Sequence, residues 1–130
     1  MISSFFEYKT KQIDSIKDKP NFTKEYGADF MRAYSEEMRY AMYSSLLDDS
    51  LDINTELDRI EQKYRFNEDM TFLLDATAQY LKWAILIEYE DYKRNAGKSS
   101  EAEIQVKAFC KMMIEEMNRS IELYPEPICE

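Results

Sequence analysis

Histidine is absent from the 130-residue sequence, and glycine, proline and cysteine are scarce, with two, three and two residues respectively. Without histidine the chain cannot build a serine–histidine triad, a histidine general base or a histidine-containing zinc or di-iron site. Two glycines cannot form a glycine-rich phosphate loop. A sheet protein of this length would need more tight turns than these glycines and prolines can supply. The composition therefore excludes the commonest catalytic devices and favours a few long helices.

The two cysteines do not form the pattern of a disulfide framework. Cys110 falls on an apolar helical stripe, where we expect it to act as a small hydrophobic residue, and Cys129 follows two prolines. The N-terminal residues lack the basic segment and the long apolar stretch of a signal peptide. The longest apolar run, 76–87, is too short to span a bilayer. We therefore expect a cytoplasmic protein (host cytoplasm if the source is viral) without membrane association.

The charge balance is strongly acidic, with a formal net charge of −9 at pH 7. Direct binding to nucleic acid requires a positive footprint, which such a chain does not offer. Anionic membrane surfaces are disfavoured for the same reason. A partner protein with a basic surface would instead be attracted and steered toward the chain.

Apolar residues recur at three- and four-residue steps along most of the chain, which is the period of a helix. The pattern predicts helices at about 4–17, 24–47, 54–65, 67–95 and 100–124. Ser4 with Glu7, and Ser100 with Glu103, have the spacing of capping boxes at the start of the first and last helices. We expect an all-α fold, an antiparallel bundle of about five helices in one domain, 1–124, with a flexible C-terminal tail, 125–130.

The helix predicted at 67–95 is apolar around most of its circumference. Such a helix is either enclosed by its neighbours or used at an interface. The side that carries Trp83 and the end that carries Tyr89 and Tyr92 offer more apolar surface than one neighbour can cover. We therefore expect this helix to be central in the bundle, or part of it to meet a second chain.

Aromatic residues and methionine are abundant, with ten Tyr, seven Phe, one Trp and eight Met. Tyr, Trp and Met are the residues that protein-binding surfaces favour. Several tyrosines lie beside carboxylates and outside the most regular apolar stripes, and the densest acidic stretch begins at 48. Together they form the predicted partner-binding set, Tyr40, Tyr43, Asp48, Asp49, Asp52, Glu88, Tyr89, Asp91 and Tyr92.

Two pairs of carboxylates leave a metal-dependent reaction open as an alternative. Glu36 and Glu37 are adjacent, and the three-residue step from Glu88 to Asp91 puts both carboxylates on one helix face. Such pairs can hold Mg²⁺ when water fills the other positions. The arrangement resembles part of the E-E-x-x-E and E-x-x-D pattern of all-helical nucleotide pyrophosphohydrolases, with Tyr40 where the third Glu would stand. The resemblance implies a magnesium-dependent nucleotide hydrolase that uses these four carboxylates.

These features favour a non-enzymatic protein that binds another protein through an acidic surface rich in Tyr and Met. It would act as an adaptor, an immunity protein or an inhibitor of the kind that phages encode, and self-association is a variant of the same hypothesis. We expect no catalytic residue, no metal and no cofactor. Two alternatives stay open, the magnesium-dependent hydrolase and a nucleic-acid mimic whose carboxylates occupy a basic DNA- or RNA-binding groove of an enzyme.

Overall fold

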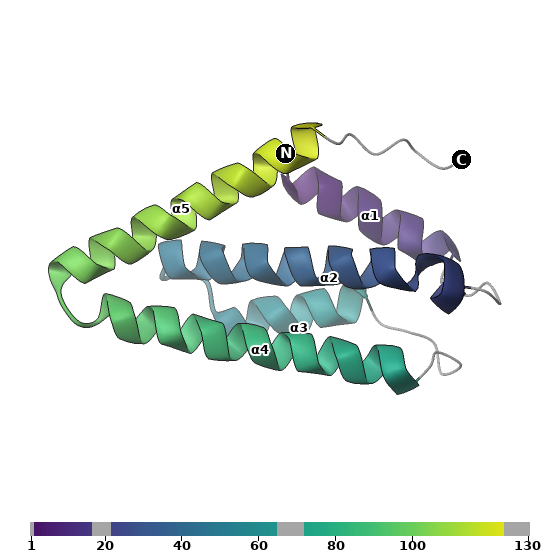
Figure 1. Ribbon diagram of the computed structural model, residues 1–130, viewed down its shortest axis with the longest axis horizontal. Helices are drawn as coiled ribbons and strands as arrows, with labels where there is room; N and C mark the ends of the chain where they lie inside the picture. The colour runs from purple at the N-terminus through teal and green to yellow at the C-terminus, as the bar shows by residue number, and fades with distance from the viewer. Residues whose placement is uncertain (1, 17–21, 65–71, 124–130) are drawn as a thin grey trace.

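The computed structural model describes residues 2–16, 22–64 and 72–123. These residues form five α-helices with short turns between some of them, and they contain no strand. The helices are α1 (Ile2–Ile16), α2 (Phe22–Leu47), α3 (Ile53–Lys63), α4 (Phe72–Ala96) and α5 (Ser100–Leu123). Consecutive helices run in opposite directions (Figure 1). The all-α antiparallel bundle predicted from the periodicity is confirmed. The predicted tail, 125–130, and the predicted start of the fourth helix lie outside the described residues.

The central helix is α2, which contacts each of the other four helices. It runs between α1 and α5 on one side and α3 and α4 on the other (Figure 1). Phe30, Tyr34, Met38 and Met42, which follow one another at four-residue steps, are completely or almost completely buried. The expectation that the helix near 67–95 is central is therefore wrong, because α4 packs mainly against α2 and α5 and leaves its outer side exposed.

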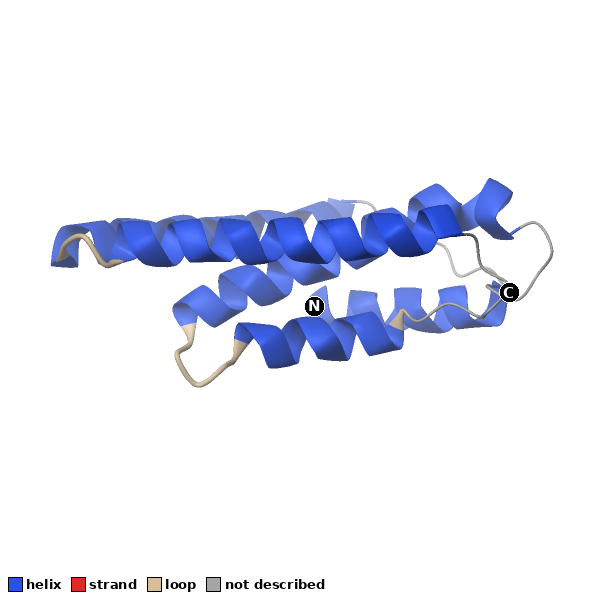
Figure 2. Ribbon diagram, turned by 90° about the horizontal axis from the view of Figure 1, so that it is seen from below, coloured by secondary structure: helices blue, strands red, loops and turns tan. Residues whose placement is uncertain are grey.

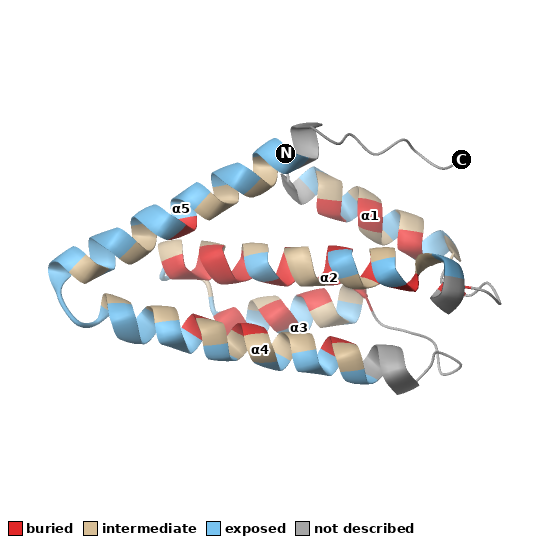
Figure 3. Cartoon of the chain, in the orientation of Figure 1, coloured by how far each residue is buried: buried red, intermediate tan, exposed pale blue. Residues whose placement is uncertain are grey.

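The distribution of buried side chains also shows that α2, and not α4, is the central helix. In α2, buried residues such as Phe30, Ala33 and Tyr43 point in several directions, toward different neighbours. In α4 the buried residues lie on the side that faces α2, and the outer side is exposed (Figure 3). The outer side of α4 is therefore apolar although no other described helix covers it.

A cluster of rings and one buried carboxylate hold α3 against α2. The ring centroid of Tyr64 lies 5.5 Å from those of Phe30 and Tyr34, edge to face in both cases. The Tyr64 hydroxyl donates a hydrogen bond of 2.9 Å to Glu37, and Lys63 Nζ donates one of 2.6 Å to the same carboxylate. Burial raises the pKa of Tyr64, so its hydroxyl stays protonated and remains a donor.

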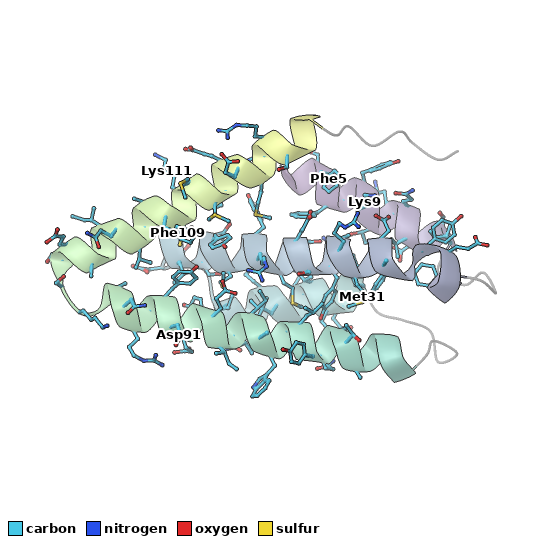
Figure 4. The ribbon with its side chains drawn as sticks, viewed as in Figure 1. Phe5, Lys9, Met31, Asp91, Phe109 and Lys111 are labelled. Atoms are coloured by element: carbon cyan, nitrogen blue, oxygen red, sulfur yellow. The ribbon has the colours of Figure 1, made fainter. Side chains whose placement is uncertain are left out.

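The first helix is attached to α2 through both apolar and charged contacts. Phe6 and Ile13 are buried, and so is most of the Lys9 side chain. Lys9 Nζ lies 3.3 Å from a carboxylate oxygen of Asp29 on α2 and 5.9 Å from the ring centroid of Phe5 (Figure 4). Pairing with a carboxylate is what makes a buried ammonium group tolerable.

The capping boxes predicted from the sequence are not the caps that the structure uses. Helix α1 begins at Ile2, so Ser4 lies inside its first turns. At the start of α5 the capping residue is Ser99, whose Oγ accepts a hydrogen bond of 3.0 Å from the backbone N–H of Ala102. Two serines are adjacent here, and the earlier one takes the capping position because the helix begins one residue sooner than the box implies.

Replacing Met38 with alanine tests the central position of α2. The side chain is fully buried, so its truncation should lower the free energy of unfolding by roughly 2–5 kcal/mol. Met112→Ala is the matched control, because it removes the same atoms from a side chain that is 49% exposed and should change stability by about 0.5 kcal/mol or less. Urea denaturation followed by circular dichroism measures both, and equal losses would contradict this packing.

Candidate protein-binding surface

A row of exposed apolar side chains runs along the outer side of α4. Tyr80, Trp83 and Ile87 are 64%, 63% and 46% exposed and follow one another at steps of three and four residues, which places them on one helix face. We call these three residues the α4 stripe. The opposite face of the helix, with Ile85 and Tyr89, is buried against the rest of the bundle.

Polar side chains beside the stripe join α4 to α3, and the stripe itself stays exposed. Figure 2 shows the bundle from below. Lys82 Nζ, next to the stripe, donates hydrogen bonds of 2.7 Å to Asp58 and 3.2 Å to Glu61 on α3. Gln79 also donates to Glu61, at 2.6 Å. The hydrogen bond to Asp58 raises the pKa of Lys82, so its ammonium group stays charged. These polar contacts fix α3 along one flank of α4.

Charged side chains surround the stripe. Asp58, on the α3 flank, keeps 65% of its side chain exposed although it binds Lys82. Glu90 and Asp91 are exposed toward the C-terminal end of the same helix, where Arg94 donates a hydrogen bond of 2.8 Å to Asp91. An aromatic centre with a charged, hydrated rim is the usual composition of a protein–protein interface.

The tyrosines of the predicted partner-binding set mostly serve the monomer. Tyr43 and Tyr89 are buried, and Tyr40 is half-buried beside α1. The ring of Phe109 reaches from α5 to a centroid distance of 5.7 Å from Tyr92 and 6.2 Å from Tyr43 (Figure 4). Desolvation by burial raises the pKa of Tyr43 and raises that of Tyr92 to about 12. These rings therefore join α2, α4 and α5.

Three of the four predicted aspartates, Asp48, Asp49 and Asp52, lie in the turn between α2 and α3, and two of them hold that turn together. Asp48 accepts hydrogen bonds from the backbone N–H and the hydroxyl of Ser50, at 2.9 and 2.7 Å, and these bonds lower its pKa. Asp52 is the N-cap of α3 and accepts a hydrogen bond of 3.0 Å from the backbone N–H of Thr55, which lowers its pKa. Asp49 is exposed and makes no such local bond that the structure describes.

This turn and the C-terminal end of α4 lie at the same end of the bundle (Figure 1). Asp49 lines a hollow of about 260 Å³ together with Lys93, Glu103 and Lys107. The structure thus brings Asp49 close to the end of α4 that carries Asp91, while the α4 stripe extends from there toward the middle of the helix.

The four carboxylates of the hydrolase alternative do not assemble into a metal site. Three of them are bound to cations of the chain, Glu37 to Lys63 at 2.6 Å, Glu88 to Arg39 at 3.3 Å and Asp91 to Arg94 at 2.8 Å. Burial raises the pKa of the fourth, Glu36. Across residues 2–16, 22–64 and 72–123, no group of three or more potential ligands could hold a metal ion. Within these same ranges, no helix has the length and hydropathy to cross a membrane.

Sequence reasoning singled out Trp83 but missed Tyr80 and Ile87 as its neighbours on the surface. The signal that could have found them is their spacing, because all three fall on one helix face, opposite Ile85 and Tyr89. No protein-family model matches the chain, and no curated protein or solved structure matches it either. The geometry of the chain itself must therefore support any functional proposal.

Trp83→Ala should leave stability nearly unchanged, within about 0.5 kcal/mol, because the side chain is mostly in water. Ile85→Ala, two positions away on the buried face, should cost roughly 2–5 kcal/mol. Trp83 is the only tryptophan, so quenching of its fluorescence by acrylamide reports its exposure directly. Quenching as weak as that of a buried indole, or a core-sized loss of stability in Trp83→Ala, would contradict the exposed stripe.

Stability should decline in strong alkali because of the buried tyrosines. Burial raises the pKa of Tyr92 from 10 to about 12, so the folded state keeps a proton that the unfolded chain releases. The stabilisation is complete below pH 10 and is lost as the pH rises through about 12. Tyr92→Phe should make this decline shallower in urea titrations at pH 9 to 12, with exposed Tyr80→Phe as the control. An identical decline in the Tyr92 variant would contradict the assignment.

Proposed function

We propose that this chain binds another protein whose contact surface carries basic side chains, and that the α4 stripe is the centre of the interface. The observation that carries the proposal is the position of Trp83 and Tyr80, both more than 60% exposed on one helix face. Trp and Tyr dominate the energetics of protein interfaces because each buries a large, rigid surface at a low cost in conformational entropy.

The helix that presents the stripe is firmly anchored, which lowers the cost of binding. The Tyr34 hydroxyl of α2 donates a hydrogen bond of 3.3 Å to the backbone carbonyl of Ala78 on α4. Ile85 and Tyr89 are buried on the same side of α4 as this contact. Little further ordering of the backbone is then needed when a partner docks, and the gain from burying the stripe is largely retained.

The size of the stripe indicates how much more surface a partner must contact. Two aromatic side chains that are more than half exposed, together with Ile87, leave roughly 300–400 Å² of apolar surface. Patches of this size on a monomer are often functional. A standard interface buries about 800 Å² on each partner, so the partner must also cover the flanks, where Asp58, Glu90 and Asp91 lie.

Charge favours a basic protein over a second copy of the chain. Each copy carries a net charge of −9, so two copies repel each other as they approach, whereas a basic partner is attracted. The surface fits nucleic-acid mimicry less well, because its centre is aromatic and several of its carboxylates, such as Asp91, already bind cations of the chain. We therefore advance protein binding alone.

The proposal is tested by capturing partners from an extract of the source organism with the wild-type chain and two matched variants. Tyr80→Ala/Trp83→Ala removes the stripe, and Ile104→Ala/Met112→Ala removes two exposed apolar side chains of α5. The stripe variant should bind the captured partner at least about thirtyfold more weakly, the effect of losing one hot spot of 2 kcal/mol or more. The α5 variant should bind like the wild type.

Two results would overturn the proposal. Equal capture by both variants would place the interface elsewhere. Sedimentation of the purified wild-type chain as a dimer that the stripe variant cannot form would show that the occupant is a second copy. Raising the salt concentration should slow association with a basic partner without abolishing binding, because the centre of the interface is apolar.

A further inference from the structure

A cavity of about 540 Å³ lies between α1, α2 and α3, apart from the α4 stripe. One face of α2 lines it with Glu37, Tyr40 and Ser44, and one face of α3 lines it with Arg59 and Lys63. Ligand pockets in proteins have volumes of roughly 300–1,000 Å³ and combine apolar walls with a few converging polar groups. The cavity therefore has the size and the composition of a small-molecule site.

The polar side of the cavity is built around one buried carboxylate. Glu37 keeps only 5% of its side chain exposed and is neutralised by Lys63 Nζ at 2.6 Å, with the Tyr64 hydroxyl at 2.9 Å from its other oxygen. Arg59 is 3.9 Å from Glu37 and donates a hydrogen bond of 3.2 Å to Glu56. Both oxygens of Glu37 are thus already engaged by the chain.

Two of the groups in the wall, Arg59 and Lys63, retain hydrogen-bond donors. Arg59 has five N–H groups, its side chain is 51% exposed, and among the described residues it makes one hydrogen bond and one longer ion contact. Lys63 has three N–H groups, of which one binds Glu37. Tyr40 and Ser44 line the same space. A planar guanidinium group with unused donors matches a carboxylate or a phosphate.

We propose that this cavity binds a small organic acid with one negative charge, whose carboxylate group is held by Arg59 and Lys63. The body of the ligand lies against Phe6, Tyr40 and Leu51, which form the apolar part of the wall. This proposal does not depend on the α4 stripe, because the cavity lies between other helices.

The carboxylates in the wall limit the charge that the ligand can carry. Glu7 and Glu56 line the cavity beside the two cations, and Glu37 lies beneath them. A polyphosphate or a nucleic acid would bring several negative charges close to these groups and would be repelled. A ligand with one acidic group and an apolar body can accept hydrogen bonds from Arg59 and meets less of that repulsion than a polyanion does.

Thermal stability of the full chain tests the proposal with three probes of known charge. Phenylacetate has one carboxylate and an aromatic body, inorganic phosphate lacks the body, and benzylamine has the body with a positive charge. At about ten times its Kd, a ligand that binds only the folded state should raise the Tm by on the order of 5 °C. We expect this rise with phenylacetate, a smaller one with phosphate and none with benzylamine.

Three variants assign the effect to the cavity. Arg59→Gln should abolish the rise, whereas Arg94→Gln should keep it, because both arginines pair with an acidic residue three positions earlier but only Arg59 lines the cavity. Ser44→Phe should abolish it by filling the space. No rise with phenylacetate up to 10 mM, an equal rise in Arg59→Gln, or a rise with benzylamine instead would each overturn the proposal. If Arg59→Gln does not fold, Ser44→Phe decides.

Discussion

The other four helices take their positions from α2, because it is the helix that each of them contacts. Its buried residues point in several directions, and burying them requires neighbours on more than one side. The other helices bury their own apolar faces by packing one side against α2 or against its neighbours. For α4, which is apolar around most of its circumference, this leaves one side without a neighbour among the described helices, and the α4 stripe is the result.

The second constraint is the buried carboxylate of Glu37. A charge so far removed from water is stable only when it is paired and hydrogen-bonded. Lys63 and Tyr64, at the end of α3, supply the cation and the hydroxyl, so α3 must lie where both can reach α2. This requirement keeps polar groups at the junction of α1, α2 and α3, where apolar side chains would otherwise fill the space, and the cavity lies there.

The two proposed binding surfaces therefore have different physical origins. The α4 stripe is apolar surface of a well-anchored helix that no other described helix covers. Its rim is charged because Lys82, Asp58 and Glu61 join α4 to α3. The cavity is a polar site at which two cations of α3, Lys63 and Arg59, lie beside the buried carboxylate of Glu37 and retain N–H groups that can bind a ligand. The α4 stripe itself does not line the cavity, but α3 contributes to both sites, with Asp58 beside the stripe and Arg59 and Lys63 in the cavity wall.

The sequence by itself determined the class of fold and the number of helices, because an apolar period of three to four residues depends only on local geometry. The described helix ends fall within two residues of the predicted ones, apart from the start of α4, and Cys110 is buried as its place on an apolar stripe indicated. The capping box predicted at Ser100 differs by one residue from the observed capping residue of α5, Ser99.

Only the tertiary structure decided which apolar helix is enclosed and which tyrosines reach water. Periodicity reports how much of a helix is apolar, but not the directions from which other helices approach it. Tyr80 and Tyr89 lie in the same helix, yet Tyr89 faces inward and Tyr80 faces solvent. The predicted partner-binding tyrosines, Tyr43 and Tyr89, are core residues of the monomer for this reason. The exposed aromatic surface became visible only when α2 was placed at the centre of the bundle.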